Sequence, residues 1–317
     1  MTRIAFVFPG QGAQAVGMGQ DFYEASASAK ARFDQADEAL GFKLSDLIFH
    51  GPEQDLKKTA NTQPALLATS IAILEAVKEL GVEPDFVAGH SLGEYCALVA
   101  ADVMSFEDAV RTVRSRGEFM EQAVPNGEGG MAAVLGADRE QLAGLCRSVT
   151  EEAGVVEMAN INCPGQIVVS GSAEGVQKLA ERGKEAGAKR VIPLEVSGPF
   201  HSSLMQPAAD RLAGVLADVP MRDASIPVVA NVTADSVLQA EQIRRLLVDQ
   251  VVSPVLWEDS VAWMIAQGVE TFVEIGSGTV LAGLIKKIDK QVQVVSINSR
   301  EALDKFAADL QAVRSSS

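Results

Sequence analysis

DFVAGHSLG, the stretch at residues 85–93, predicts a buried strand, a tight turn and a helix in direct succession. The stretch 85–89, apolar after Asp85, is typical of a buried strand, and a helical pattern from about residue 91 to 101 follows it at once. Residues 89–93 match the pattern Gly-x-Ser-x-Gly, whose glycines leave room for a serine at the tip of a sharp strand-to-helix turn. Ser91 is therefore a candidate nucleophile, although a serine that only caps the helix would fit the same pattern.

Helices and strands alternate on both sides of this unit. The apolar run 3–8 predicts a strand closed by Pro9 and Gly10, and apolar residues recur at helical spacing over 62–80. Further helices are expected over 106–124, 241–251 and 257–267, with one more that ends at residue 219 and one that begins at residue 279. Further strands are expected over 226–232, 271–275 and 292–297. The order predicts a large α/β domain with a parallel sheet, assembled from residues 1–125 and 198–317.

A different pattern occupies the stretch between these two segments. It starts after the turn-forming residues PNGEGG at 125–130. The expected elements are strand 131–135, helix 138–149, strand 155–162, strand 166–170, helix 173–186 and strand 190–196. This βαββαβ order is that of a ferredoxin-like unit, whose two ends lie close together. We therefore expect a small ferredoxin-like subdomain, residues 126–197, inserted into the large domain.

Composition excludes several classes of function. The chain has 317 residues, 47% of them hydrophobic, and 27 basic against 42 acidic side chains give a net charge of −15, so a nucleic-acid partner is not expected. We expect no membrane partner and a cytoplasmic location, because the chain lacks a long apolar span and a signal-peptide pattern at its N-terminus. Its three cysteines are scattered and form no Cys-x-x-Cys pair, which argues against a disulfide framework or a zinc site.

A serine nucleophile needs a base, and histidine is the usual base at neutral pH. The chain has three histidines. His201 lies in GPFHS at 198–202, on the loop that re-enters the large domain, where functional residues are common. His90 is expected to support the pocket beside Ser91, and His50 to lie in a surface turn. His201 is the candidate base, and a structural histidine near a helix start is the alternative.

Two other segments are candidates for ligand contact. Residues 9–14, PGQGAQ, lack the Gly-x-Gly-x-x-Gly spacing of a dinucleotide site, which leaves an oxyanion-hole segment or an ordinary turn. Arg116 shares an otherwise apolar helix face with Met120, so its guanidinium is predicted to need an anionic partner. A substrate carboxylate would match the guanidinium fork.

The chain resembles the malonyl-CoA:acyl carrier protein transacylase family over essentially its whole length. The matching motifs are FPGQG at 8–12, TQPAL at 62–66, GHSLGE at 89–94, RSRG at 114–117, GQIVVSG at 165–171, GPFHS at 198–202 and QVVSPV at 250–255. The resemblance implies an α/β-hydrolase-like large domain with an inserted ferredoxin-like subdomain, in agreement with the element pattern.

The resemblance also implies a role for each matched residue. Ser91 would be the acylated nucleophile and His201 its general base, oriented by the backbone carbonyl of Gln250 rather than by an acid. The backbone N–H groups of Gln11 and Leu92 would form the oxyanion hole. Arg116 would bind the malonyl carboxylate, and the other substrate-binding positions would be Gln63, His90, Met120, Asn160, Asn162 and Phe200. The ring of Phe200 would leave little space for an α-methyl group.

The implied activity is ping-pong transfer of a malonyl group from malonyl-CoA to the phosphopantetheine thiol of acyl carrier protein, a step of fatty acid biosynthesis. No cofactor or metal is expected, and a monomer is the default. An acidic carrier would need a local basic patch, for which the candidates are Lys286, Lys287, Lys290, Lys189 and Arg190, unless these side chains are merely solvated.

Two alternatives differ in the class of protein. A serine esterase or thioesterase would need an acid at a strand end between Ser91 and His201, and Asp102, Asp108 and Asp138 do not sit at such a place. A non-catalytic module that binds acyl-CoA or a carrier protein would not use Ser91 at all.

Overall fold

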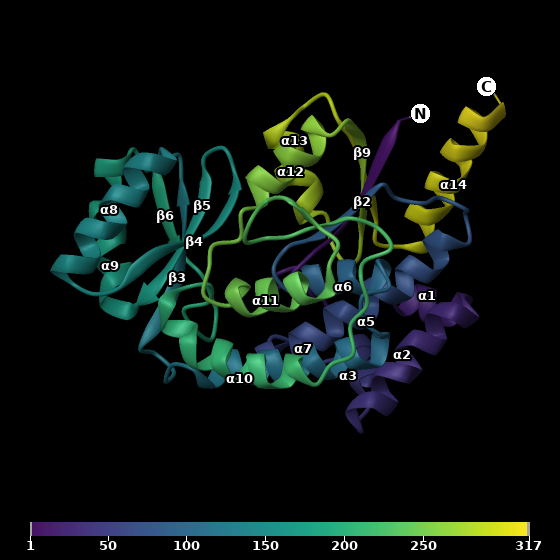
Figure 1. Cartoon of the computed structure of the whole chain (residues 1–317), viewed down its shortest axis with the longest axis horizontal. Helices are drawn as coiled ribbons and strands as arrows, with labels where there is room; N and C mark the ends of the chain where they lie inside the picture. Colours follow the sequence, from purple (N-terminus) through teal and green to yellow (C-terminus); the bar gives the residue numbers. More distant parts are fainter. Residues whose placement is uncertain (1, 316–317) are drawn as a thin grey trace.

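The computed structural model describes residues 2–315, which form a mixed α/β fold around two sheets (Figure 1). The larger sheet has six strands in the order β10-β9-β1-β2-β7-β8, parallel except for the pair of β7 with β8. Its strands are β1 (Arg3–Phe8), β2 (Phe86–Gly89), β7 (Val228–Val229), β8 (Ser236–Val237), β9 (Val269–Ile275) and β10 (Gln293–Ile297). The predicted α/β class with a parallel sheet is confirmed.

Alternate residues of the central strands face two separate cores. Phe6 and Phe8 of β1 pack with one group of helices, and Ala5 and Val7 pack with another. Figure 1 shows these groups on opposite sides of the sheet. The first group includes α5 (Thr59–Lys78), α6 (Gly93–Ala100), α7 (Phe106–Gln122), α10 (Gln206–Ala217), α11 (Ala240–Gln250) and α14 (Arg300–Ser315), and the second α12 (Trp257–Ala266) and α13 (Val280–Ile288). Burial on both faces explains the continuous apolar runs of β1 and β2.

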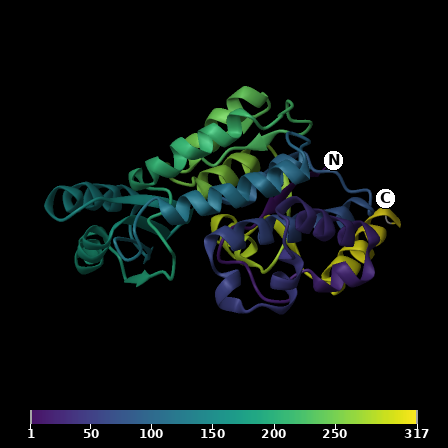
Figure 2. The same ribbon diagram turned by 90° about the horizontal axis from the view of Figure 1, so that it is seen from below.

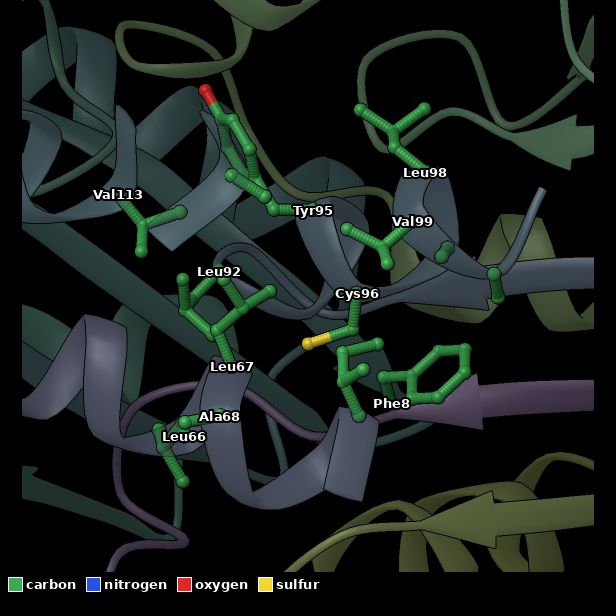
Figure 3. Packing of buried hydrophobic residues seen from close by; sticks show 14 of the residues in the cluster. Phe8, Leu66, Leu67, Ala68, Leu92, Tyr95, Cys96, Leu98, Val99 and Val113 are labelled. Carbon is green, nitrogen blue, oxygen red and sulfur yellow. The ribbon is translucent and has the colours of Figure 1, made fainter. Parts of the chain in front are cut away.

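The N-terminus of α6 is held in place by the first of these cores. Figure 3 shows Leu92 and Cys96, from the start of α6, packed against Leu67 of α5 and Phe8 of β1. All four side chains are at most 1% exposed. Removing this apolar surface from water stabilises the junction between β2 and α6, so the turn that carries Ser91 is built on a rigid base.

A second, four-stranded antiparallel sheet occupies one end of the molecule, and the chain termini lie toward the other (Figure 2). Its order is β4-β5-β3-β6, and its core is closed by two helices on one face. The elements are β3 (Gly129–Leu135), α8 (Arg139–Glu152), β4 (Val156–Cys163), β5 (Gln166–Ser172), α9 (Ala173–Arg182) and β6 (Arg190–Pro193). Asp138 and Ser172 start the two helices by accepting hydrogen bonds from Gln141 N and Gly175 N.

Backbone hydrogen bonds tie the small sheet to the segment that follows α11. Ile161 N donates to Val255 O at 2.9 Å, and Val255 N donates to Ala159 O at 2.8 Å. Strand β4 therefore reaches the segment that follows α11, and it brings residues of the small sheet to the large one.

Several predicted elements have different bounds. The expected strand 226–232 is reduced to β7, because the chain turns where Ala230 N donates to Asp235 O. The expected strand 190–196 ends at Pro193, and one further backbone hydrogen bond, from Leu194 N to Met131 O, follows it. The expected helix 173–186 ends at Arg182 and tightens into a 3-10 turn over Gly183–Ala186.

Four helices before α5 were not predicted: α1 (Gln20–Ala25), α2 (Ala27–Leu40), α3 (Leu44–His50) and α4 (Glu53–Leu56). His50, which was expected in a surface turn, is exposed but ends α3. Within residues 2–315, none of the helices combines the length and apolar character that a membrane span requires.

Candidate active site

Ser91 lies at the sharp turn between β2 and α6, with the left-handed φ of 51° that side chains rarely adopt. A Cβ on Gly89 would stand 1.9 Å from the carbonyl of Gly93, and one on Gly93 would stand 2.1 Å from Phe8 O. A Cβ on Gly10 would be 2.3 Å from His90 O. The turn thus packs backbone against backbone, and glycine is needed wherever a side chain would separate the segments.

Replacing Gly89 with alanine should therefore lower the free energy of unfolding by about 3 kcal/mol or more, because backbone atoms rather than a movable side chain occupy the space. Gly214→Ala is the control, since Gly214 is an exposed residue of α10 with no atom within 4 Å of an added Cβ. It should be neutral or stabilising by about 0.5–1 kcal/mol. Urea unfolding measures both, and equal effects would contradict this account of the turn.

Ser91 Oγ lies 2.7 Å from His201 Nε2, although 110 residues separate the two in sequence. The other ring nitrogen, Nδ1, lies 2.8 Å from the backbone oxygen of Gln250. A carbonyl oxygen can only accept, so Nδ1 carries the proton and Nε2 is left to accept from the serine hydroxyl. A nucleophile, a base and an orienting backbone group are therefore linked by two successive hydrogen bonds.

His201 is held neutral by its surroundings. It is 3% exposed, and burial together with the nearby charge of Arg116 lowers its pKa to about 3. Its backbone, like that of Ser91, is left-handed, with φ 57°. Left-handed side-chain-bearing residues at both partners are a form of strain that concentrates at functional sites.

Arg116 of α7 points its guanidinium at the same serine. It is 1% exposed, and it donates from Nη2 to Ser91 Oγ at 3.1 Å and to Gln250 Oε1 at 2.9 Å, and from Nη1 to Gln63 Oε1 at 2.8 Å. Burial lowers its pKa. Its hydrogen-bond partners among residues 2–315 are neutral, so none of them is the anionic partner predicted for it.

The two predicted oxyanion-hole residues lie on adjoining turns. Leu92 directly follows Ser91, and the Gln11 segment adjoins it because Gly10 abuts His90 O. Neither backbone N–H group donates to an acceptor within the described residues. The Gln11 side chain donates to Thr59 Oγ1 at 3.0 Å, which fixes this loop to the start of α5. Both backbone N–H groups are thus fixed in position and have no acceptor within the described residues.

The remaining predicted positions surround this centre at different depths. His90 Nε2 lies 2.8 Å from Asn162 Oδ1, and Gln63 Nε2 donates to Met120 Sδ at 3.5 Å. Asn160 and Phe200 are buried, at 8% and 6% exposure, but no hydrogen bond links them to Ser91, His201 or Arg116. Asn160 and Asn162 lie on β4, so the small sheet contributes to the site.

The part of the chain that the structure describes holds no group of three His, Cys, Asp or Glu side chains that could bind a metal ion.

Comparison with known proteins is consistent with this geometry. A family model described as an acyl transferase domain matches residues 5–313. A malonyl CoA-acyl carrier protein transacylase from Bacillus subtilis (strain 168) is 55% identical to this chain over 96% of both sequences. The chain belongs to the malonyl-CoA:acyl carrier protein transacylase family. The family resemblance inferred from the motifs is confirmed.

Solved structures of this family superpose closely on the chain. An acyl carrier protein S-malonyltransferase from Vibrio cholerae is 45% identical and has a TM-score of 0.94, with 96% of this chain and all of that chain (100%) covered. A type II PKS acyl-carrier protein has been solved in complex with its malonyl-transacylase, a chain 42% identical to this one. Its TM-score is 0.94, and the match covers 97% of this chain and 100% of that one.

Sequence reasoning assigned no role to two buried residues of this family member. Asn231 accepts from Ser91 N at 2.9 Å and donates to Gly89 O at 2.7 Å, which clamps both sides of the turn. Glu94 accepts from Gln250 Nε2 at 2.7 Å, and burial raises its pKa to about 7. The same signal that singled out Arg116, a charge in an otherwise apolar helix, would have found Glu94. Asn231 carries no comparable local signal.

Proposed function

We propose that this acyltransferase moves the malonyl group of malonyl-CoA to the phosphopantetheine thiol of acyl carrier protein through a malonyl-Ser91 intermediate, as a step of fatty acid biosynthesis. One observation carries the proposal. A serine paired with a neutral histidine lies 3.1 Å from the buried guanidinium of Arg116, so a nucleophile and a carboxylate-binding cation meet at one point. A thioester whose acyl group bears a free carboxylate is the substrate that uses both.

In the first half-reaction, Ser91 Oγ attacks the thioester carbonyl while His201 Nε2 takes the hydroxyl proton. The carbonyl of Gln250 holds the ring in the tautomer that can accept this proton. The N–H groups of Gln11 and Leu92 donate to the oxyanion of the tetrahedral intermediate. The carbon–sulfur bond then breaks, and the proton passes from His201 to the sulfur of coenzyme A, so that this half-reaction has no net proton change.

The second half-reaction runs the same steps in reverse with a different thiol. His201 takes the proton of the phosphopantetheine thiol, and the sulfur attacks the malonyl-Ser91 ester. The oxyanion again lies between the two backbone amides, and the proton returns to Ser91 Oγ as the ester bond breaks. All proton transfers use groups of the chain, so no cofactor is proposed.

Arg116 supplies selectivity for the acyl group in this proposal. Its buried guanidinium pairs with the malonyl carboxylate, which an acetyl group lacks, and the pairing places the thioester against Ser91. Gln63, His90, Met120, Asn160 and Asn162 would line the acyl and pantetheine path. The Phe200 ring, which precedes His201 in the chain, would leave little space for a substituent on the malonyl carbon.

The contacts of His201 do not support the two alternative functions, an esterase or a non-catalytic binding module. A serine esterase or thioesterase would place a carboxylate on His201 Nδ1, where this chain has the backbone oxygen of Gln250. A silent binding module would have no use for a serine, a neutral histidine and two unused amides aligned on one point.

We also propose the finer description of the fold: an α/β-hydrolase-like domain with a ferredoxin-like subdomain at residues 126–197. The βαββαβ order and the strand order β4-β5-β3-β6 support it. The ends of the insertion are adjacent, since a Cβ on Gly129 would stand 2.6 Å from Pro199 Cδ. A monomer in the cytoplasm is part of the same proposal.

The direct test is the intact mass of the purified protein after mixing with malonyl-CoA in the absence of carrier protein, beside a Ser91→Ala control. A malonyl adduct on the wild type alone would establish the intermediate. Release of coenzyme A without an adduct would indicate hydrolysis and favour the esterase. Neither adduct nor release would favour another acyl donor or the binding module.

Carrier docking is expected at the exposed basic end of α13, which carries Lys286 and Lys287 and is followed by Lys290. Lys286 donates to Val292 O, so Lys287→Glu is the cleaner test. Its KM for carrier protein should rise roughly five- to ten-fold, because like charges would repel, while malonylation by malonyl-CoA stays unchanged. The exposed Lys305 of α14 gives the control, Lys305→Glu. An unchanged KM for Lys287→Glu would rule out docking there.

A further inference from the structure

The buried cation and a buried anion of this site are joined through one neutral amide. Gln250 Oε1 accepts from Arg116 Nη2 at 2.9 Å, and Gln250 Nε2 donates to Glu94 Oε2 at 2.7 Å. The three side chains come from α7, α11 and α6, and they are 1%, 0% and 3% exposed. Gln250 therefore bridges the guanidinium of Arg116 and the carboxyl group of Glu94.

The two charges determine which way the Gln250 amide points. An amide oxygen only accepts and an amide nitrogen only donates, so the cation selects the oxygen and the carboxylate selects the nitrogen. Nε2 also donates to Ser91 O at 3.0 Å and to Asn231 Oδ1 at 3.1 Å, but its bond to Glu94 is the shortest. The Gln250 residue that orients His201 through its backbone thus orients Arg116 through its side chain.

Electrostatics give Glu94 a second role besides hydrogen bonding. A buried guanidinium is costly without a compensating anion, and Glu94 is the buried carboxylate that reaches it through Gln250. When a substrate carboxylate arrives, two anions share one cation. Each then disfavours the charge on the other, so a neutral Glu94 favours binding of the substrate.

We propose that Glu94 is a positioning residue for malonyl recognition: it holds the Gln250 amide against Arg116, and its charge competes with the malonyl carboxylate for the guanidinium. The inference deepens the proposed function and rests on it, since it concerns recognition of the acyl carboxylate. Glu94 touches neither Ser91 Oγ nor His201, so it acts through Gln250 and Arg116.

The titration of Glu94 makes the competition measurable. Burial raises its pKa to about 7. Hydrogen bonds from Gln250 and from Asn231 N, and the charge of Arg116 on α7, lower the pKa by less than burial raises it. Tyr95, beside it on α6, stays neutral because burial raises the pKa of its phenol. His201 is also neutral. As pH rises from about 6 to about 8, Glu94 gains its charge, so the KM for malonyl-CoA should rise several-fold while that for acetyl-CoA stays level.

Two variants separate the hydrogen bond from the charge. Glu94→Gln keeps an acceptor for Gln250 Nε2 and removes the charge, so malonyl-CoA should bind as tightly as it does to the wild type at low pH, without pH dependence. Glu94→Ala removes both, so selectivity for malonyl over acetyl should fall about ten-fold or more. Glu274→Gln is the matched control: Glu274 is 0% exposed and bonded to Leu281, Ala282 and Ser296, and its loss should leave the pH dependence of KM intact.

The experiment is the rate of Ser91 acylation by malonyl-CoA and acetyl-CoA from about pH 6 to about pH 8, followed by intact mass, with a thermal melt of each variant. A wild-type pH profile that survives in Glu94→Gln would overturn the role of the charge, and this near-isosteric variant decides the matter even if Glu94→Ala does not fold. Unchanged selectivity in a folded Glu94→Ala would overturn the role of the bond. Absence of a malonyl adduct on the wild type would instead refute the proposed function.

Discussion

His201→Ala protein is expected to lose malonyl transfer almost as completely as Ser91→Ala protein, with kcat/KM lower by roughly 10⁴-fold or more in each. The reason is the 2.7 Å contact between Ser91 Oγ and His201 Nε2. A serine hydroxyl is a weak nucleophile until a base takes its proton, and the pKa of His201, lowered to about 3, leaves this base neutral at physiological pH. Residues that act as a unit lose their joint contribution when either is removed.

The double variant Ser91→Ala/His201→Ala should therefore be little worse than either single variant. Stopped-flow or quenched transfer of malonyl from malonyl-CoA to carrier protein measures all three. His50→Ala is the matched control, because His50 is an exposed histidine at the end of α3 and should keep full activity. Strictly additive losses in the double variant would show that Ser91 and His201 do not act together.

Arg116→Ala should change which acyl group is transferred rather than abolish transfer. Leaving the malonyl carboxylate desolvated and unpaired costs ~2–5 kcal/mol, which is a loss of roughly thirty-fold or more in kcat/KM for malonyl-CoA. An acetyl group has no carboxylate to lose, so acetyl transfer should be retained or should increase. The ratio of the two kcat/KM values is the quantity to measure.

Arg111→Ala on the same helix provides the control for a lost arginine. Its side chain is 56% exposed and pairs with Asp108, so both transfer rates should be unaffected. An equal fall in malonyl and acetyl transfer in Arg116→Ala would mean that Arg116 supports the fold of the site or Ser91 itself, and would contradict its assignment as the carboxylate-binding residue.

The local sequence pattern was sufficient to predict those helices and strands whose buried residues follow one another in the chain. Strand β1 and the unit of β2 and α6 were predicted within two residues of their observed bounds, because both sheet faces are covered and most positions are apolar. The strand expected at 226–232 was too long, because its end is decided by a turn at Ala230 and by pairing with β2. The helices between residues 20 and 56 were missed because α2 carries a weak apolar stripe among many polar side chains.

The residues of the candidate site also differ in whether local sequence or distant partners reveal them. Ser91 follows from five consecutive residues, since the sterics of a glycine-flanked turn are local. The charge of Glu94 in an apolar helix is a local signal, but its role was missed because its partner Gln250 is 156 residues away. Asn231 was missed for the same reason, because its clamp on Gly89 O and Ser91 N exists only where the ends of β2 and β7 lie side by side.

The α/β class, the serine turn and the family follow from the amino-acid sequence alone, since each depends on short-range periodicity, glycine placement or contiguous motifs. Tertiary structure alone decided that His201 meets Ser91, that Arg116 has neutral protein partners, and that Gln250 stands between Arg116 and Glu94. Hydrogen bonds and charge compensation act over a few ångströms in space, and the sheet brings together at one edge residues that the chain keeps far apart.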